Sequence, residues 1–119
     1  MNVAVLGASK KPERYSYKAV KLLQEKGHTP FPIHPVLDEI DGIRVYEKLP
    51  EVTEPVDTVT VYLSPENANK VAGDILNSGA RRVIFNPGAE NPDLADSLRD
   101  KGTLVVEACT LVLLKTGQF

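Results

Sequence analysis

Cysteine, histidine and long apolar runs are scarce in this sequence of 119 residues. The single cysteine, Cys109, excludes an intramolecular disulfide. Since the only histidines are His28 and His34, the chain also lacks the ligands of a structural zinc site. No apolar run exceeds about five residues, which is too short to cross a membrane. Met1 and Asn2 lead directly into a short apolar segment, without the charged flank and long apolar core of a signal peptide. We therefore expect a soluble, reduced, cytoplasmic domain.

An excess of positive charge is also absent. Lys and Arg number 14 and Asp and Glu 16, so the net charge is -2, and we expect no nucleic-acid-binding surface spread over the whole domain. Hydrophobic residues make up 42% and charged residues 25%, as in ordinary globular proteins. A chain of this length forms one domain, 1–119, that buries roughly two-thirds of its unfolded surface.

Short β-branched segments alternate with amphipathic ones along the chain. We expect strands at 2–6, 29–33, 58–63, 82–85 and 103–106, and a small edge strand at 42–46. Pro30 and Pro32 cannot donate to a sheet ladder, so the 29–33 strand is predicted at or near a sheet edge. Strands linked by helical crossovers are parallel and the crossovers are right-handed. The pattern predicts a single-domain α/β fold, a doubly wound Rossmann-like parallel sheet of about five strands with helices on both faces.

Capping residues predict the ends of three helices. The candidate N-caps are Ser16 before a helix over 17–25, Ser64 before a helix over 65–76, and Asn91 before a helix that Gly102 closes. Gly27 follows the first of these helices as a C′ residue, and Pro65 suits the first position of the second. The sequence pattern does not decide the secondary structure of the apolar segment 111–114.

In open α/β sheets, ligands bind beyond the carboxyl ends of the strands. The loops at that rim are rich in Gly, Pro and small polar residues, which permit close approach of backbone to a ligand, although ordinary turns use the same residue types. The candidate site residues there are Gly7, Ala8, Ser9, Lys10, Lys11, Pro12, Arg14, His34, Pro35, Ser64, Pro65, Asn86, Pro87, Gly88 and Cys109.

The first of these loops, 7–14, is the strongest candidate for an anion site. Gly7 leaves room for a phosphate beside the backbone, and Ser9 offers a hydroxyl. The N–H groups that follow, together with a helix N-terminus, suit an anion. Positive charge is concentrated within the same loop on Lys10, Lys11 and Arg14. A solvated charged loop has the same composition and is the alternative interpretation.

A nicotinamide dinucleotide fits this sequence poorly. Its fingerprint, G-x-G-x-x-G, is followed by an acidic residue at the end of the second strand. Here Gly7 stands alone, and the second strand ends in Ile33, His34 and Pro35, with Asp38 as the nearest acid. We expect a phosphate-bearing ligand that is not held by its ribose diol.

A series of short motifs runs in order along the chain. They are Val5-Leu6-Gly7-Ala8-Ser9, Lys11-Pro12-x-Arg14-x-Ser16-Tyr17, Ile33-x-Pro35, Leu49-Pro50, Pro55-Val56-Asp57, Val61-Tyr62-Leu63-Ser64-Pro65-Glu66, Gly79-Ala80 and Cys109. In this order and spacing the chain, from Val3 to about Cys109, resembles the small CoA-binding proteins whose fold matches the N-terminal domain of the succinyl-CoA synthetase α subunit. The resemblance implies CoA as the ligand. It places the CoA phosphates on the first loop, the adenosine end beside Pro35, Ser64 and Pro65, and the cleft wall at Asn86 and Pro87.

Three positions depart from the family pattern because they lack a basic residue. They are Val36 after the second-strand proline, Leu63 at the end of the third strand, and Ala108 before the cysteine. Each phosphate contact of this kind is worth roughly 1.5–3 kcal/mol, so their loss weakens CoA binding or changes the ligand.

No catalytic constellation stands out in the sequence. His34 and Cys109 are predicted at the same rim, but nothing in the sequence pairs them, and a free thiol is usually a packing residue. Two functions remain open. One is a non-catalytic protein that binds CoA, an acyl-CoA or a similar adenine nucleotide, and the other is part of an acyl-CoA-processing enzyme whose nucleophile lies on a partner chain. Either function is compatible with a homo-oligomer.

Overall fold

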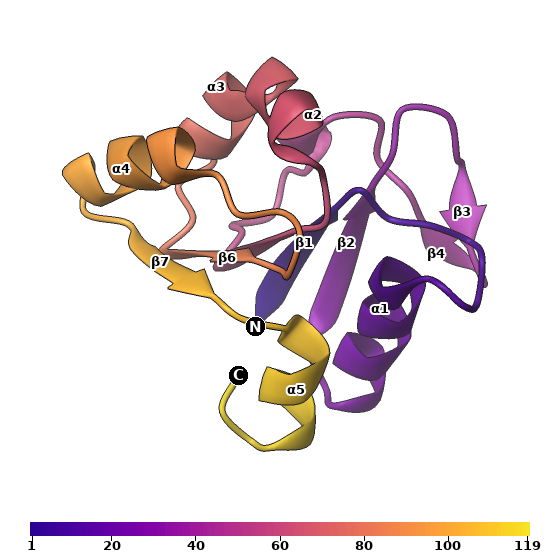
Figure 1. Ribbon diagram of the computed structural model, residues 1–119. Coiled ribbons are helices and arrows are strands. Elements are labelled where there is room, and N and C mark those ends of the chain that lie inside the picture. The colour runs from indigo at the N-terminus through magenta and orange to yellow at the C-terminus, as the bar shows by residue number, and fades with distance from the viewer.

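A five-stranded sheet forms the centre of the computed structural model, which describes residues 1–119 (Figure 1). Its strands are β1 (Asn2–Leu6), β2 (Thr29–Ile33), β5 (Thr58–Val61), β6 (Arg82–Phe85) and β7 (Leu104–Glu107). All are parallel and lie in the order β2-β1-β5-β6-β7. The chain builds one edge from β1 to β2, and then crosses back to build β5, β6 and β7 on the other side. This order confirms the predicted doubly wound, Rossmann-like α/β fold.

Helices cover both faces of the sheet (Figure 1). On one face lie α2 (Pro65–Lys70), α3 (Ala72–Leu76) and α4 (Pro92–Asp100), and on the other lie α1 (Tyr15–Glu25) and α5 (Thr110–Lys115). Successive side chains of β1 point alternately toward the two layers of helices. Ala4 and Leu6 belong to the core shared with α3 and α4, whereas Val3 and Val5 belong to the core shared with α1 and α5. None of the helices has the length and apolar content needed to span a bilayer.

The two prolines of β2 place it at a sheet edge, as predicted. Thr29 donates its N–H to the Met1 carbonyl at 3.0 Å, so the alternate residues Pro30 and Pro32 turn away from β1, where no donor is needed. Tyr46 covers this outer side by donating its N–H to the Pro32 carbonyl at 2.9 Å. The edge is therefore closed by a short stretch of chain rather than left open.

The predicted edge strand over 42–46 is wrong in its extent and pairing. β4 (Ile43–Arg44) pairs antiparallel with β3 (Glu39–Ile40) in a separate two-stranded ribbon. The two-residue loop between them has positive φ at both positions, 50° at Asp41 and 83° at Gly42. A type I′ hairpin turn requires this combination, and it pairs Ile43 and Arg44 with β3, so that only Tyr46 of the predicted strand contacts the central sheet.

Two of the predicted N-caps are confirmed. At the start of α2, Ser64 Oγ accepts the N–H of Asn67 at 3.4 Å, and at the start of α4, Asn91 Oδ1 accepts the N–H of Leu94 at 3.3 Å. The segment 111–114, to which the sequence assigned no type, lies within α5.

Two other helix predictions are wrong. Ser16 is not an N-cap, because α1 begins at Tyr15, two residues before the predicted start, and Ser16 lies buried in its first turn. The continuous helix predicted over 65–76 is broken at Val71, whose φ of -121° and ψ of 17° depart from helical values. α2 and α3 are therefore separate short helices.

Candidate functional site

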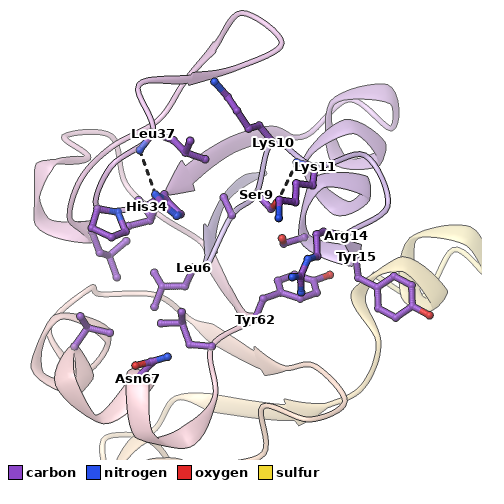
Figure 2. A pocket seen from close by; sticks show the side chains of 18 of the residues that line it. Leu6, Ser9, Lys10, Lys11, Arg14, Tyr15, His34, Leu37, Tyr62 and Asn67 are labelled. Atoms are coloured by element: carbon purple, nitrogen blue, oxygen red, sulfur yellow. Dashed lines mark hydrogen bonds between the residues drawn. The ribbon is translucent and has the colours of Figure 1, made fainter.

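A cleft of about 1270 Å³ opens at the carboxyl ends of β1, β2 and β5, where the strand order reverses (Figure 2). This is the position of ligand sites in open α/β sheets. The volume exceeds the roughly 300–1,000 Å³ of common small-molecule pockets, so the cleft suits an extended ligand. The predicted site residues that line it belong to the loops after β1, β2 and β6: Gly7, Ala8, Ser9, Lys10, Lys11, Arg14, His34, Pro35 and Pro87.

The remaining predicted residues do not line the cleft: Pro12, Ser64, Pro65, Asn86, Gly88 and Cys109. Asn86 is only 2% exposed and uses its whole amide inside the fold. Its Nδ2 donates to Thr60 Oγ1 at 2.7 Å and to the Val61 carbonyl at 2.9 Å, while its Oδ1 accepts the N–H of Thr110 at 2.8 Å. Its polar atoms therefore join β5, β6 and α5.

His34 and Cys109 lie on different parts of the sheet. His34 follows β2 at one edge and Cys109 follows β7 at the other, with β1, β5 and β6 between those strands. Cys109 is a half-buried free thiol just before α5, and its side chain caps no N–H of that helix. The arrangement does not form the thiol–imidazole pair of a cysteine nucleophile.

The loop after β1 leaves backbone N–H groups free at the cleft. Ser9 Oγ accepts the N–H of Lys11 at 3.1 Å, and the Lys11 carbonyl accepts the N–H of Arg14 at 3.0 Å, so the loop folds into successive turns. The N–H groups of Ser9 and Lys10 donate to no acceptor within the protein. Free N–H groups in a turn that precedes a helix form an anion-binding backbone.

Gly7 is required by the fold itself. Its φ is 84°, and a Cβ at this position would lie 3.0 Å from Leu63 Cδ2 and 3.2 Å from the Tyr62 carbonyl. The sequence suggested that the missing Cβ makes room for a ligand. The structure gives a more direct reason for glycine at this position. The end of β1 packs closely against the segment that follows β5, which leaves no room for a Cβ.

Positive charge surrounds the cleft. Besides the cations of the first loop, it is lined by Lys18 of α1, Lys48 just before the 3₁₀ turn η1 (Leu49–Glu51), and Lys70 at the end of α2. The acidic lining residues, Glu13, Glu47 and Asp74, are outnumbered, although the whole chain has a net charge of -2. Sequence reasoning missed Lys18, Lys48 and Lys70, since all three lie outside the loops that follow the strands and reach the cleft only through the folded path of the chain.

His34 presents one defined hydrogen-bonding atom to the cleft. Its Nδ1 accepts the backbone N–H groups of Val36 at 3.0 Å and Leu37 at 3.2 Å, the second of which is drawn in Figure 2. Because Nδ1 is an acceptor, the neutral ring carries its proton on Nε2. That N–H makes no bond within the protein and can donate to a bound molecule.

The cleft has an apolar wall as well as a basic one. The apolar lining consists of Leu6, Ile33, Leu37, Leu49, Leu63 and Val71. Tyr62 also lines it, and its hydroxyl is buried without a hydrogen-bond partner. Burial raises the pKa of Tyr62 to about 12, so this hydroxyl stays neutral at ordinary pH. A ligand with anionic groups at one part and apolar groups at another matches this surface.

Known proteins are similar to this one in sequence and fold. YneT of Bacillus subtilis, an uncharacterized protein, is 31% identical over 111 residues, which cover 92% of this chain and 82% of YneT. The ADP-forming acetate–CoA ligase of Methanocaldococcus jannaschii is 28% identical over 84 residues, which cover 71% of this chain but 12% of the ligase. The crystal structure of another uncharacterized protein matches with a TM-score of 0.93 at 38% identity, over 99% of this chain and 97% of that one.

The sequence profile of the CoA binding domain matches residues 1–115, which is nearly the whole chain. The resemblance found in the short motifs therefore extends from the first strand into the last helix. This protein belongs to the CoA-binding domain family.

Proposed function

We propose that this protein binds CoA or an acyl-CoA in the cleft and catalyses no reaction on its own. The observation that carries the proposal is that one cleft combines free N–H groups at Ser9 and Lys10, a surrounding set of basic side chains and an apolar wall. CoA has matching parts, because its phosphates need donors and cations while its base and pantetheine arm bury apolar surface. Membership of the CoA-binding domain family supports the same ligand.

The loop after β1 is the proposed site of the CoA phosphates. Its free N–H groups and the cations Lys10, Lys11 and Arg14 lie in one turn structure. Hydrogen bonds between such cations and phosphate are charge-assisted, which makes them stronger than neutral ones. The related family commonly has basic residues at the positions of Val36 and Leu63. Lys48 and Lys70 are proposed to supply in their place the electrostatic attraction for the CoA phosphates.

A binding role agrees with the chemistry of the lining side chains. The Nδ1 of His34 accepts two backbone N–H groups, so this nitrogen is occupied in holding a turn of the chain. The Tyr62 hydroxyl, with its pKa raised to about 12, does not supply a base at neutral pH. The Nε2–H of His34 is left to position a ligand, whereas the Tyr62 hydroxyl is buried.

A second candidate function is that of the CoA-binding part of an acyl-CoA-processing enzyme whose nucleophile lies on a partner chain. The likeness to a segment that makes up 12% of an acetate–CoA ligase favours it. The two candidates differ in one measurable respect. The first predicts retention of acyl-CoA without turnover, and the second predicts turnover that begins when a second protein is added.

Titration calorimetry with CoA tests the binding site. The variant with Lys10, Lys11 and Arg14 replaced by alanine should bind CoA at least about 100-fold more weakly and with a flatter salt dependence, at an unchanged melting temperature. The matched control replaces the exposed cations Lys26, Arg99 and Lys115, which lie outside the cleft and carry the same total charge. Equal CoA affinity of the two variants would exclude the first loop as the phosphate site. Mass spectrometry of the small molecule that copurifies with the protein would identify the acyl group.

A further inference from the structure

The turn between β3 and β4 contains the one Asp-Gly sequence of the chain, Asp41-Gly42, and the chain has no Asn-Gly. Both residues are exposed. An aspartate that precedes glycine is chemically labile, because the backbone nitrogen of the glycine can reach the side-chain carboxyl carbon with little steric hindrance. The turn is therefore a candidate site of spontaneous modification of the main chain.

The carboxylate of Asp41 is bound to α1, beside which the β3–β4 ribbon lies (Figure 1). The Tyr17 hydroxyl donates to Asp41 Oδ2, and Lys21 Nζ lies 3.3 Å from the same oxygen. Both contacts favour the ionised carboxylate and hold the pKa of Asp41 below its ordinary value. A nucleophile attacks an ionised carboxylate poorly, whereas a protonated carboxyl can lose its hydroxyl as water. The contacts with α1 therefore keep Asp41 in its less reactive form.

The attacking nitrogen is held in place as well. The Gly42 N–H donates to Glu39 Oε2, a side-chain oxygen of β3. The backbone of Asp41 is left-handed, with a φ of 50°, and Gly42 follows with a φ of 83°. A succinimide ring between Asp41 Cγ and the Gly42 nitrogen closes only when the backbone leaves this type I′ conformation. The folded turn thus keeps apart two atoms that the sequence makes neighbours.

We propose that Asp41-Gly42 is a modification site at which aspartate converts to isoaspartate, at a rate controlled by the attachment of the β3–β4 ribbon to α1. The lone pair of the Gly42 nitrogen forms a bond to Asp41 Cγ, the nitrogen loses its proton, and the carboxyl hydroxyl leaves as water. One water molecule then opens the succinimide. Cleavage of the new Cγ–N bond restores aspartate, and cleavage of the original peptide bond leaves a main chain that runs through Cβ and Cγ. The reaction consumes no oxidant, reductant or cofactor.

Detachment of the ribbon is the step that must precede this chemistry. Ile40 pairs with Ile43 directly across the turn, so the turn changes conformation only when this short ladder opens. Such local opening requires less free energy than global unfolding. The rate of modification therefore measures the fraction of molecules in which the ribbon has left α1. Isoaspartate adds one atom to the main chain inside the turn, which the pairing of Ile40 with Ile43 cannot accommodate.

Incubation in heavy-oxygen water followed by peptide mapping tests the proposal, because each cycle of ring closure and opening incorporates a heavy oxygen atom at Asp41. The chain unfolded in guanidinium chloride gives the unprotected rate, and Asp41 should react there faster than every other aspartate. The folded protein should react at least roughly tenfold more slowly than the unfolded chain. Equal rates in the folded and unfolded protein, or faster reaction at another aspartate of the unfolded chain, would overturn the proposal.

A double variant tests the control by α1. Tyr17→Phe with Lys21→Met removes both contacts with Asp41 and should speed the reaction of the folded protein by roughly fivefold or more, at an unchanged rate in guanidinium chloride. The matched control is Tyr15→Phe with Lys18→Met, which changes the same residue types on the same helix where neither bonds to Asp41. A double variant that reacts at the parent rate, or a control that reacts as fast as the double variant, would show that α1 does not control the site.

Discussion

The hydroxyl groups of Thr60 and Thr110 lie 2.7 Å apart, between the central strand β5 and the first residue of α5. Both residues are fully buried. Asn86 completes the network by donating to the Thr60 hydroxyl and accepting the Thr110 N–H. The position of α5 on the sheet therefore depends on polar contacts as well as on apolar packing.

Asn86→Ala should lower the free energy of unfolding by about 2–4 kcal/mol, because it leaves the Thr110 N–H buried without an acceptor and removes two further hydrogen bonds. Urea denaturation measures this loss. Asn77→Ala, at an exposed asparagine that ends α3, should change the same quantity by less than about 0.5 kcal/mol. The folded Asn86→Ala protein should keep its CoA affinity, since Asn86 does not line the cleft. A loss of affinity at unchanged stability would instead make Asn86 a binding residue.

Gly7 and Gly102 allow the cost of a close contact to be separated from the cost of backbone strain. Their φ values are 84° and 86°, but a Cβ at Gly102 would meet no atom within 4 Å, whereas one at Gly7 would contact Leu63 and Tyr62. Gly102→Ala should cost roughly 1–2 kcal/mol of strain. Gly7→Ala should cost a further 1–3 kcal/mol or so, as is typical of overpacking. Equal losses in thermal unfolding would contradict the close approach at Gly7.

Lys48 and Lys70 should contribute to CoA affinity although neither belongs to the first loop. Replacing both with alanine should weaken binding by roughly tenfold and flatten its salt dependence, because two cations leave the rim of the cleft. Calorimetry at two salt concentrations measures both effects. The control replaces Lys26 and Lys115, which are exposed elsewhere. If the control weakens binding equally, only the overall charge of the protein matters.

Leu63 and Ala108 stand where the family commonly carries basic residues, but the structure separates them. Leu63 lines the cleft and Ala108 does not. Leu63→Arg should therefore tighten CoA binding by roughly tenfold through a new charge-assisted hydrogen bond, whereas Ala108→Arg should leave it unchanged. Binding assays on the two single variants decide the matter. A gain from Ala108→Arg alone would show that the ligand extends toward β7.

Asp41 fixes the β3–β4 ribbon to α1 and should make stability depend on acid pH. The hydrogen bond from the Tyr17 hydroxyl, together with the Lys21 ammonium at 3.3 Å, holds the pKa of Asp41 below its ordinary value. The stabilisation is therefore full above the unfolded pKa, about 3.9, and is lost as pH falls through the lower folded value. Asp41→Asn removes the charge while keeping a residue that tolerates positive φ.

Urea denaturation at a series of pH values measures the effect. The unfolding free energy of Asp41→Asn should fall less steeply than that of the parent from about pH 5 to about pH 2. Asp38→Asn, at an exposed acid of the neighbouring loop, should follow the parent curve. Parallel acid limbs for Asp41→Asn and the parent would show that Asp41 contributes nothing through its charge.

Short-range sequence patterns predicted the helices and strands of this protein better than the breaks between them. Ser64 and Asn91 cap helices through contacts with residues three positions on, and such contacts can be read directly from the sequence. The break at Val71 could not be read, because apolar residues continue at helical spacing on both sides of it. Lys70 reaches the cleft just before this break. The first-loop cations were therefore predictable, whereas those that come from later segments were not.

The cleft is built almost entirely from the chain up to Val71 and Asp74, with Pro87 as the last lining residue, while β7 occupies the far edge of the sheet. No lining residue belongs to α4, β7 or α5, so a molecule bound in the cleft contacts no part of the chain after Pro87. Surface substitutions in α4, β7 or α5 that leave the protein folded should therefore leave the binding constant of the cleft unchanged.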